Sequence, residues 1–435
     1  MTRGLGFAAA VAAALALPAT AFAHASLSSA SPPTQATVQT APTEIRLRFN
    51  SSVTATAAAI RVLAPDGAVL SGASRVSQDS RVVTAPVTGL NRGTAYTVRW
   101  RVTGSDGHSP AGVFTFGIGV PAPPPTEAVG AVAATWKDDI ARWLLFAALA
   151  LVIGPLVIRL LVLSGPMPDA LERRFHLVTT VAAFAVIDIG IVAFVVRASN
   201  ALQLPVAELL YGDLQPFAEK TRFGIAFLVM TVGFAVVATL LLLAWVLDRH
   251  ELRWPALALS AVLVTGLSVS GHQGTEPNAT VASEVADWVH LMAAAVWVGG
   301  VATLALLVWP LAPDLRQRAF LGFSRLAVGL VAAMVLAGIY LALVRLPELS
   351  DLWQTGYGQL LLLKIAIVAL ALAWGGFHHS FVRPRLEAGG HPRVRASLIG
   401  EAVVAAAVLL AAAMLTNASP PVADPPSKAV VRHSR

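Results

Sequence analysis

The chain has 435 residues, of which 56% are hydrophobic and 13% are charged, and its formal net charge is +7. It contains no cysteine, which excludes disulfides, thiolate metal sites and a cysteine nucleophile. The apolar composition indicates a membrane protein, and we interpret the positive charge as a signal of membrane topology rather than of nucleic-acid binding.

Residues 1–23 have the pattern of a secretory signal peptide. Arg3 lies in a short basic start, an apolar run follows, and Ala21-Phe22-Ala23 is typical of a cleavage site. Cleavage after Ala23 would leave His24 with a free α-amine beside its imidazole, and this pair of nitrogen donors suits Cu(II). The alternative is that the cleavage site merely happens to precede a histidine.

Residues 24–120 are predicted to fold as a small all-β sandwich. Five short runs are rich in Val, Ile, Thr or aromatic residues, and turn signals such as Pro65-Asp66-Gly67 separate them. About 95 residues are enough for such a core. The predicted strands are 45–49, 58–63, 81–87, 95–102 and 113–118.

His108 is the only other histidine between residues 24 and 120. Asp106 lies two positions before it, so on an extended segment both side chains point to the same side. Together with His24 they would supply two imidazoles, one amine and one carboxylate. The alternative is an ordinary surface turn, since Asp106-Gly107 is a common turn pair.

Several motifs of this segment occur together in one known family: His24-Ala25-Ser26-Leu27, Tyr96-Thr97-Val98-Arg99-Trp100, Ser105-Asp106-Gly107-His108 and Phe114-Thr115-Phe116. They resemble the CopC family of periplasmic copper proteins, a β-sandwich of Ig-like or cupredoxin-like Greek-key type. The resemblance implies that His24, with its α-amine, Asp106 and His108 bind Cu(II). Some members also bind Cu(I) in a methionine-rich loop, but this segment contains no Met.

A Pro-rich linker is predicted over residues 121–138, followed by an all-α integral membrane domain over 139–417 and a polar tail over 418–435. Eight apolar stretches are long enough, or nearly so, to cross a hydrocarbon core of about 30 Å. The fourth is short, and its Gly and Ser residues predict an irregular outer end. The eight stretches are 140–163, 175–197, 221–247, 255–271, 284–309, 319–345, 359–381 and 397–416.

Arginines indicate the orientation of these spans. The loops after the first, third, fifth and seventh spans are rich in Arg, and the positive-inside rule assigns them to the cytoplasm. An even number of spans then returns the C-terminus to the side of His24. We therefore expect a multi-pass protein of the bacterial inner membrane whose N-terminal domain lies in the periplasm. The arginines are Arg173, Arg174, Arg249, Arg253, Arg316, Arg318, Arg383, Arg385, Arg393 and Arg395.

Polar groups inside a membrane are costly and are therefore candidates for function. His272, at the outer end of span four, and His290, in span five, are the candidate copper ligands; the alternatives are a histidine facing water and a hydrogen bond to a neighbouring helix. Asp188 in span two is a weaker candidate, with pairing to an arginine or serine as its alternative. His378 and His379 at the cytoplasmic end of span seven could form an exit site for the metal or an amphipathic belt.

The stretch from His290 to Gly300, the run from Thr355 to Lys364 and Glu401 resemble the CopD family of inner-membrane copper proteins. One departure is that the family usually has an Asn-Arg pair where this chain has His378-His379. We interpret Lys364 as an interfacial side chain whose amine reaches the membrane surface. The resemblance implies copper uptake or copper tolerance.

The sequence thus predicts a CopC–CopD fusion that captures Cu(II) outside and transports copper inward. The expected partners are copper ions, inner-membrane lipid and periplasmic copper chaperones or a copper-requiring acceptor, with no nucleic acid. We expect no enzyme activity, since no phosphate-binding glycine loop is present. The alternatives are a copper-dependent oxidative enzyme built on a histidine brace and a haem-binding electron carrier.

Overall fold

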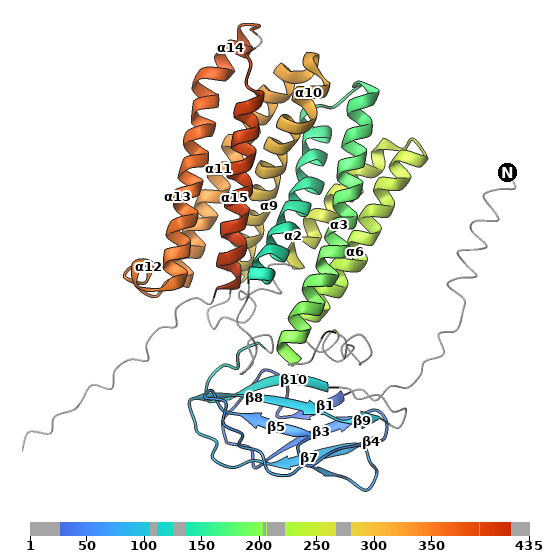
Figure 1. Cartoon of the computed structure of the whole chain (residues 1–435), viewed down its shortest axis with the longest axis vertical. Coiled ribbons are helices and arrows are strands. Elements are labelled where there is room, and N and C mark those ends of the chain that lie inside the picture. Colours follow the sequence, from blue (N-terminus) through green and yellow to red (C-terminus); the bar gives the residue numbers. More distant parts are fainter. Residues whose placement is uncertain are drawn as a thin grey trace, which may run out of the picture.

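The computed structural model of this chain describes residues 27–104, 111–124, 136–202, 206, 222–266, 280–390 and 392–418. It shows a β-sandwich followed by a bundle of long helices, with the sandwich lying at one end of the bundle (Figure 1). The predicted signal peptide at 1–23 lies outside the described residues.

The sandwich consists of two four-stranded sheets and a two-stranded ribbon. The first sheet has the order β1-β3-β7-β6, with bounds Leu27–Ser31, Glu44–Phe49, Val82–Pro86 and Arg75–Val76. The second has the order β2-β10-β8-β5, with bounds Ala36–Val38, Ala111–Ile118, Thr94–Arg101 and Ile60–Leu63. The ribbon pairs β4, Val53–Thr54, with β9, Thr103–Gly104.

The core lies between the two four-stranded sheets. In β3 the residues alternate strictly between exposed and buried, so that Ile45, Leu47 and Phe49 all face inward. Phe49 meets Trp100 of β8 edge to face, with ring centroids 5.4 Å apart, and this contact joins the two sheets. The five predicted strands correspond to β3, β5, β7, β8 and β10, which confirms the sandwich.

Within the described residues, seven helices are long and apolar enough to cross a membrane. Three of them continue from an α-helix into a short π-helical segment at the same end of the bundle. The helical elements are α2 Trp136–Val157 with η2 Ile158–Val162, α3 Asp169–Leu202, α6 Arg222–Val246, α9 Val281–Thr303 with η5 Leu304–Val308, α11 Arg316–Arg345, α13 Gly356–Phe377 with η7 His378–Val382, and α15 Arg395–Asn417.

The predicted span 255–271 differs from the other seven. Its first part forms α7, Arg253–Leu263, which at 11 residues is too short to count as a span. Residues 267–279 lie outside the described part of the chain. The structure therefore shows seven of the eight predicted spans as candidate membrane helices, together with the start of the fourth.

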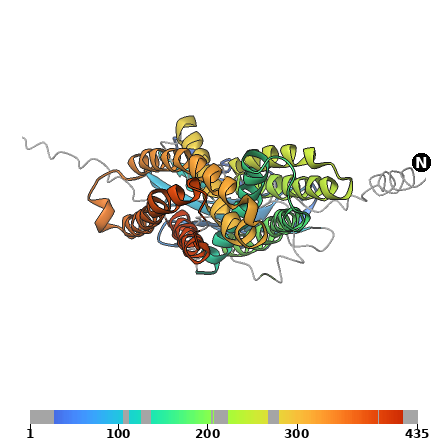
Figure 2. The ribbon, with the colours of Figure 1, turned by 90° about the horizontal axis from the view of Figure 1, so that it is seen from above.

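The centre of the bundle is the contact between α2 and α9. Figure 2, viewed along the helices, shows α13 and α15 at one end of an elongated bundle and α3 and α6 at the other. α2 packs against α3, α9 and α15, and the Nε1 of Trp143 on α2 donates a 2.9 Å hydrogen bond to the carbonyl of Ala406 on α15. A Cβ on Gly299 of α9 would lie only 2.0 Å from the carbonyl oxygen of Ala150, so the two backbones are in direct contact.

The two ends of the bundle differ in charge. The predicted arginine-rich loops join the helices at the end away from the sandwich, where α10 (Trp309–Leu311) and α14 (Arg383–Glu387) lie (Figure 1). We call this the arginine-rich end. There, Glu172 of α3 accepts hydrogen bonds from Arg253 of α7 and, at 3.0 Å, from Arg159 of η2. These pairs tie three segments together at this end. The opposite end, which carries α12 (Asp351–Gln354) and faces the sandwich, is called the sandwich end (Figure 1).

Candidate functional site

The predicted Cu(II) ligands His24, Asp106 and His108, and the membrane histidine His272, lie outside the described residues. Among the described residues, no group of three or more His, Asp or Glu side chains is placed to hold a metal ion. The described part instead contains two polar clusters inside the helical bundle, one built around His290 and one around His378.

The His290 cluster lies in the half of the bundle nearer the sandwich end. His290 is on α9, which begins at that end, and its Nδ1 lies 2.8 Å from the backbone carbonyl oxygen of Met334 on α11. A carbonyl can only accept, so Nδ1 carries the proton and donates. Nε2 therefore keeps its lone pair, and it lies 3.4 Å from Nζ of Lys364 on α13. The imidazole thus presents its unprotonated nitrogen toward α13.

Two further features define the surroundings of His290. A Cβ on Gly338 of α11 would lie 3.2 Å from Cε1 of the imidazole, so the absence of a side chain there makes room for the ring. Asp287, almost one turn before His290 on α9, lies 3.7 Å from Arg345 at the end of α11. We define the His290 cluster as His290, Asp287, Arg345 and Lys364.

The His378 cluster lies near the arginine-rich end, where α13 passes into η7. Nδ1 of His378 lies 2.7 Å from Oε2 of Glu401 on α15, and Nε2 lies 2.8 Å from Oγ of Ser397. Nε1 of Trp374 donates a 3.0 Å hydrogen bond to the same Oγ. Both His378 and Glu401 are buried. These four residues join α13 and η7 to α15 through buried and partly buried hydrogen bonds, and both ring nitrogens of His378 have partners.

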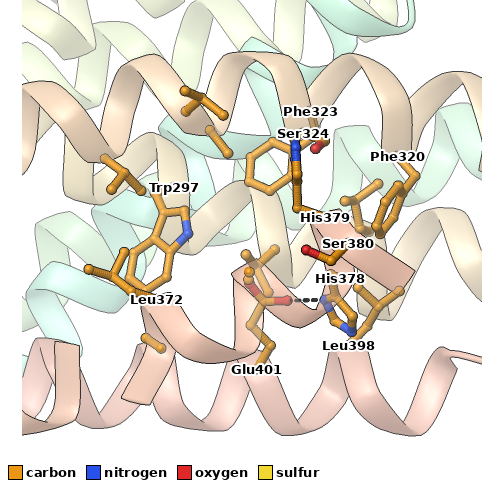
Figure 3. A pocket seen from close by; sticks show the side chains of 18 of the residues that line it. Trp297, Phe320, Phe323, Ser324, Leu372, His378, His379, Ser380, Leu398 and Glu401 are labelled. Carbon is orange, nitrogen blue, oxygen red and sulfur yellow. Dashed lines mark hydrogen bonds and ion pairs between the residues drawn. The ribbon is translucent and has the colours of Figure 1, made fainter. Parts of the chain in front are cut away.

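A cavity of about 530 Å³ lies beside the His378 cluster, between α9, α11, α13 and α15. Figure 3 shows Trp297 on one side of it, Phe320 and Phe323 on another, and the His378–Glu401 pair at its floor. His379 also lines this space, and its side chain is exposed. The cavity is therefore mostly apolar, with its polar groups gathered at the end of α13.

Comparison with known proteins identifies the two halves of the chain. Residues 27–119 match the CopC domain, residues 135–280 match the copper resistance protein D-like N-terminal domain, and residues 317–415 match copper resistance protein D. The chain is a CopC domain followed by CopD domains. It is therefore a copper resistance or copper transport protein, with a soluble N-terminal domain and a multi-pass membrane domain.

This CopC–CopD chain is also similar to two individual proteins and to one solved structure. It is 26% identical to the copper transport protein CutJ of Bacillus subtilis (strain 168) over 405 residues, which are 86% of this chain and 71% of CutJ. It is 31% identical to copper resistance protein D of Pseudomonas syringae pv. tomato over 114 residues, 24% of this chain and 36% of that protein. Its structure aligns with 93% of CopC from Methylosinus trichosporium OB3b, at 30% identity, 22% coverage of this chain and a TM-score of 0.20.

The structure of the CopC–CopD chain adds detail to three residues singled out from the sequence. The amine of Lys364, expected near an interface, lies 3.4 Å from Nε2 of His290. The proposed alternative for His290, a hydrogen bond to a neighbouring helix, is confirmed for Nδ1, and Nε2 contacts Lys364. Glu401, known from the sequence only as part of a motif, is the buried partner of His378.

The remaining sequence candidates take separate positions in the CopC–CopD chain. Asp188 is exposed on α3, which packs mainly against α2 and α6. His378 would have to leave Glu401 or Ser397 before it could bind a metal. Among the described candidates, His290 is therefore the one whose unprotonated nitrogen faces another helix in the half of the bundle nearer the sandwich end, where it contacts only the amine of Lys364.

Proposed function

We propose that this protein captures Cu(II) in its CopC domain outside the membrane and passes copper inward through its CopD domain. The observation that carries the proposal is the geometry of His290. A backbone carbonyl fixes its tautomer, so that Nε2 points between α9 and α13 in the half of the bundle nearer the copper-binding domain. Of the described histidines in the membrane domain, His290 is the first that copper arriving from the sandwich would reach.

This function requires a particular arrangement of domains and a particular orientation in the membrane, which we propose as follows. Residues 1–23 are a cleaved signal peptide, 24–120 the periplasmic CopC domain, 121–138 a linker, 139–417 the inner-membrane CopD domain and 418–435 a tail. We propose eight membrane passages, with α7 beginning the short fourth one. The position of the arginine-rich end, away from the sandwich, supports a cytoplasmic assignment for that end (Figure 1).

We propose His24, through its α-amine and imidazole, together with Asp106 and His108, as the Cu(II) ligands. The described flanking strands support this set. Leu27, three residues after His24, pairs with Phe49 at the end of β3, and Gly104, two residues before Asp106, pairs with Val53 at the start of β4. Since residues 49 and 53 are separated by one short turn, both flanking segments reach the same end of the sandwich.

In the membrane domain we propose His290 as the copper ligand, with His272 as its partner. A single imidazole does not hold copper well, and His272 is the nearest histidine before His290 in the sequence. We propose no metal role for His378, His379 or Asp188. We propose that these sites exchange copper with a partner protein. The partner is either a periplasmic chaperone that delivers copper or an acceptor that receives it inside the cell.

A cellular test uses copper accumulation in a deletion strain that carries wild type, His24→Ala or His290→Ala. We expect His290→Ala to reduce accumulation by roughly tenfold or more, because loss of groups around a metal costs about 10- to 100-fold in affinity or activity. His250→Ala is the matched control, since His250 is half exposed at the arginine-rich end and pairs with Asp248. Equal accumulation in every strain would contradict import, and a Soret band in the purified protein would favour the haem alternative.

The packing of the His290 ring against Gly338 gives a second test, with a smaller expected effect. Gly338→Ala should reduce copper accumulation by roughly threefold. A shift of about 1 Å in a reacting group can cost a hundredfold in rate, and the added Cβ requires the His290 ring to move by only a few tenths of an ångström. Gly329→Ala on the same helix is the control, because a Cβ there meets nothing within 4 Å. If the two variants accumulate copper equally, the position of the His290 ring does not limit transport.

A further inference from the structure

Lys364 occupies the place next to His290 where a metal ion would bind. We propose that Lys364 is a built-in cation that holds Nε2 of His290 until copper displaces it, and that this exchange admits copper as a monovalent ion. This inference rests on the proposed function, because it assumes that His290 binds copper. It adds a specificity-determining residue to that site.

Steric exclusion is the first argument. A first-row metal bonds an imidazole nitrogen at about 2 Å. The Nε2 lone pair faces Nζ of Lys364 at 3.4 Å, so a metal on that lone pair would lie much closer to Nζ than two cations can approach. Copper and the amine of Lys364 therefore cannot occupy the site together. The flexible four-carbon stem allows the amine to swing toward the sandwich end and its polar surface.

Charge is the second argument. Among the described residues, the charged groups around His290 are Asp287 on α9, Arg345 on α11 and Lys364 on α13. One negative and two positive side chains leave a neutral His290 in a cluster with one net positive charge. Exchange of the Lys364 cation for a monovalent metal keeps that charge. A divalent metal would add a further charge in a medium of low dielectric constant beside Arg345, which is costly.

The exchange implies a reduction step before the membrane site. Copper bound as Cu(II) in the CopC domain must gain one electron to enter as Cu(I). The chain contains no cysteine to supply it. An external thiol reductant would suffice, since two thiols reduce two Cu(II) ions, form one disulfide and release two protons.

Metal titration of the full-length protein tests the exchange. The probes are Ag(I), a monovalent ion without redox chemistry here, and Zn(II), its divalent counterpart. The His24→Ala and His108→Ala substitutions remove the proposed site in the sandwich, so that binding reports the membrane domain. On this background we expect Lys364→Leu, which adds no metal ligand, to tighten Ag(I) binding by roughly tenfold, because a hydrogen bond to a charged group no longer competes. Lys364→Arg, which keeps a cation, should bind as the unsubstituted protein does.

Each other outcome has a definite meaning. Weaker Ag(I) binding by Lys364→Leu would make the amine a ligand, and unchanged binding would show that the amine does not compete; either result overturns the proposal. Zn(II) bound as tightly as Ag(I) would overturn the monovalent preference. Lys364→Gln gives the same expected sign if Lys364→Leu does not fold. Addition of His290→Ala should abolish the effect of Lys364→Leu; if His290→Ala also leaves cellular copper accumulation unchanged, the proposed function fails independently of this exchange.

Discussion

Gly299→Ala should lower the stability of the membrane domain more than the other glycine-to-alanine substitutions proposed above. A Cβ on Gly299 would lie 2.0 Å from the carbonyl oxygen of Ala150, and a Cβ on Gly154 would lie 2.4 Å from Cα of Gly299. These neighbours are backbone atoms, which cannot rotate away as a side chain can. The two helices would have to separate along their whole contact.

The expected size follows from overpacking in other cores. Insertion of a methyl group into a close-packed contact costs about 3 kcal/mol at the upper end of the usual range. For a domain of this size that loss lowers the melting temperature by roughly 6–12 °C. The shift is measured by heating the purified protein in detergent and monitoring the loss of monodisperse protein as it unfolds.

Gly376→Ala on α13 is the matched control for that experiment. Gly376 is also a glycine inside a membrane helix, but a Cβ there meets nothing within 4 Å. It should melt within about 4 °C of wild type, since an exposed Gly to Ala change in a helix alters stability by roughly 1 kcal/mol or less. Equal melting temperatures for Gly299→Ala and wild type would show that α2 and α9 do not cross as closely as the structure has them.

The close contact at Gly299 could be predicted from the sequence because it depends on local spacing. Gly299 is followed by small residues at the positions that share its helix face, which is the pattern of tightly crossing membrane helices. Five strands of the sandwich and seven membrane helices were predictable for the same reason, since alternation and long apolar runs are visible in one segment at a time. The strands β1, β2, β4, β6 and β9 were not predicted. Four of these have only two or three residues, which is too short to show a period.

The environment of Lys364 could not be predicted, because it depends on a partner 74 residues away on another helix. A lysine close to the end of an apolar run usually extends along its own helix to the membrane surface, and the sequence offers no sign of the direction it takes. The same limit applies to His378 and Glu401, which are 23 residues apart on different helices.

The proposed Cu(II) site shows how sequence and structure complement each other. The ligands His24, Asp106 and His108 come from a resemblance to a family, and they lie outside the described residues. The described strands on either side nevertheless converge, because β1 and β9 both pair with the chain around residues 49–53. A site that joins the mature N-terminus to the segment after β9 is therefore compatible with the sandwich.

Insertion of one alanine between Ala23 and His24 should abolish high-affinity Cu(II) binding by the mature protein. The insertion converts the α-amine of His24 into a peptide nitrogen and leaves the imidazole unchanged. We expect the affinity to fall at least about a hundredfold, since even the loss of an outer partner of a ligand costs about 10- to 100-fold. The measurement is a Cu(II) titration of the full-length protein, with mass spectrometry of its N-terminus to establish where cleavage occurred.

Ala25→Ser is the matched control, because it changes the adjacent residue and keeps the terminal amine of His24. Its Cu(II) affinity should stay within about threefold of wild type, as expected for a small change that removes no ligand. Unchanged affinity in the insertion variant, with cleavage shown before the added alanine, would mean that the α-amine is not a ligand and that the proposed Cu(II) site is wrong. An N-terminus found elsewhere in the wild type would instead contradict the predicted cleavage after Ala23. A loss of affinity confined to the insertion variant would show that signal-peptide removal itself completes the copper site, so that the protein binds Cu(II) tightly only after it has reached the far side of the membrane.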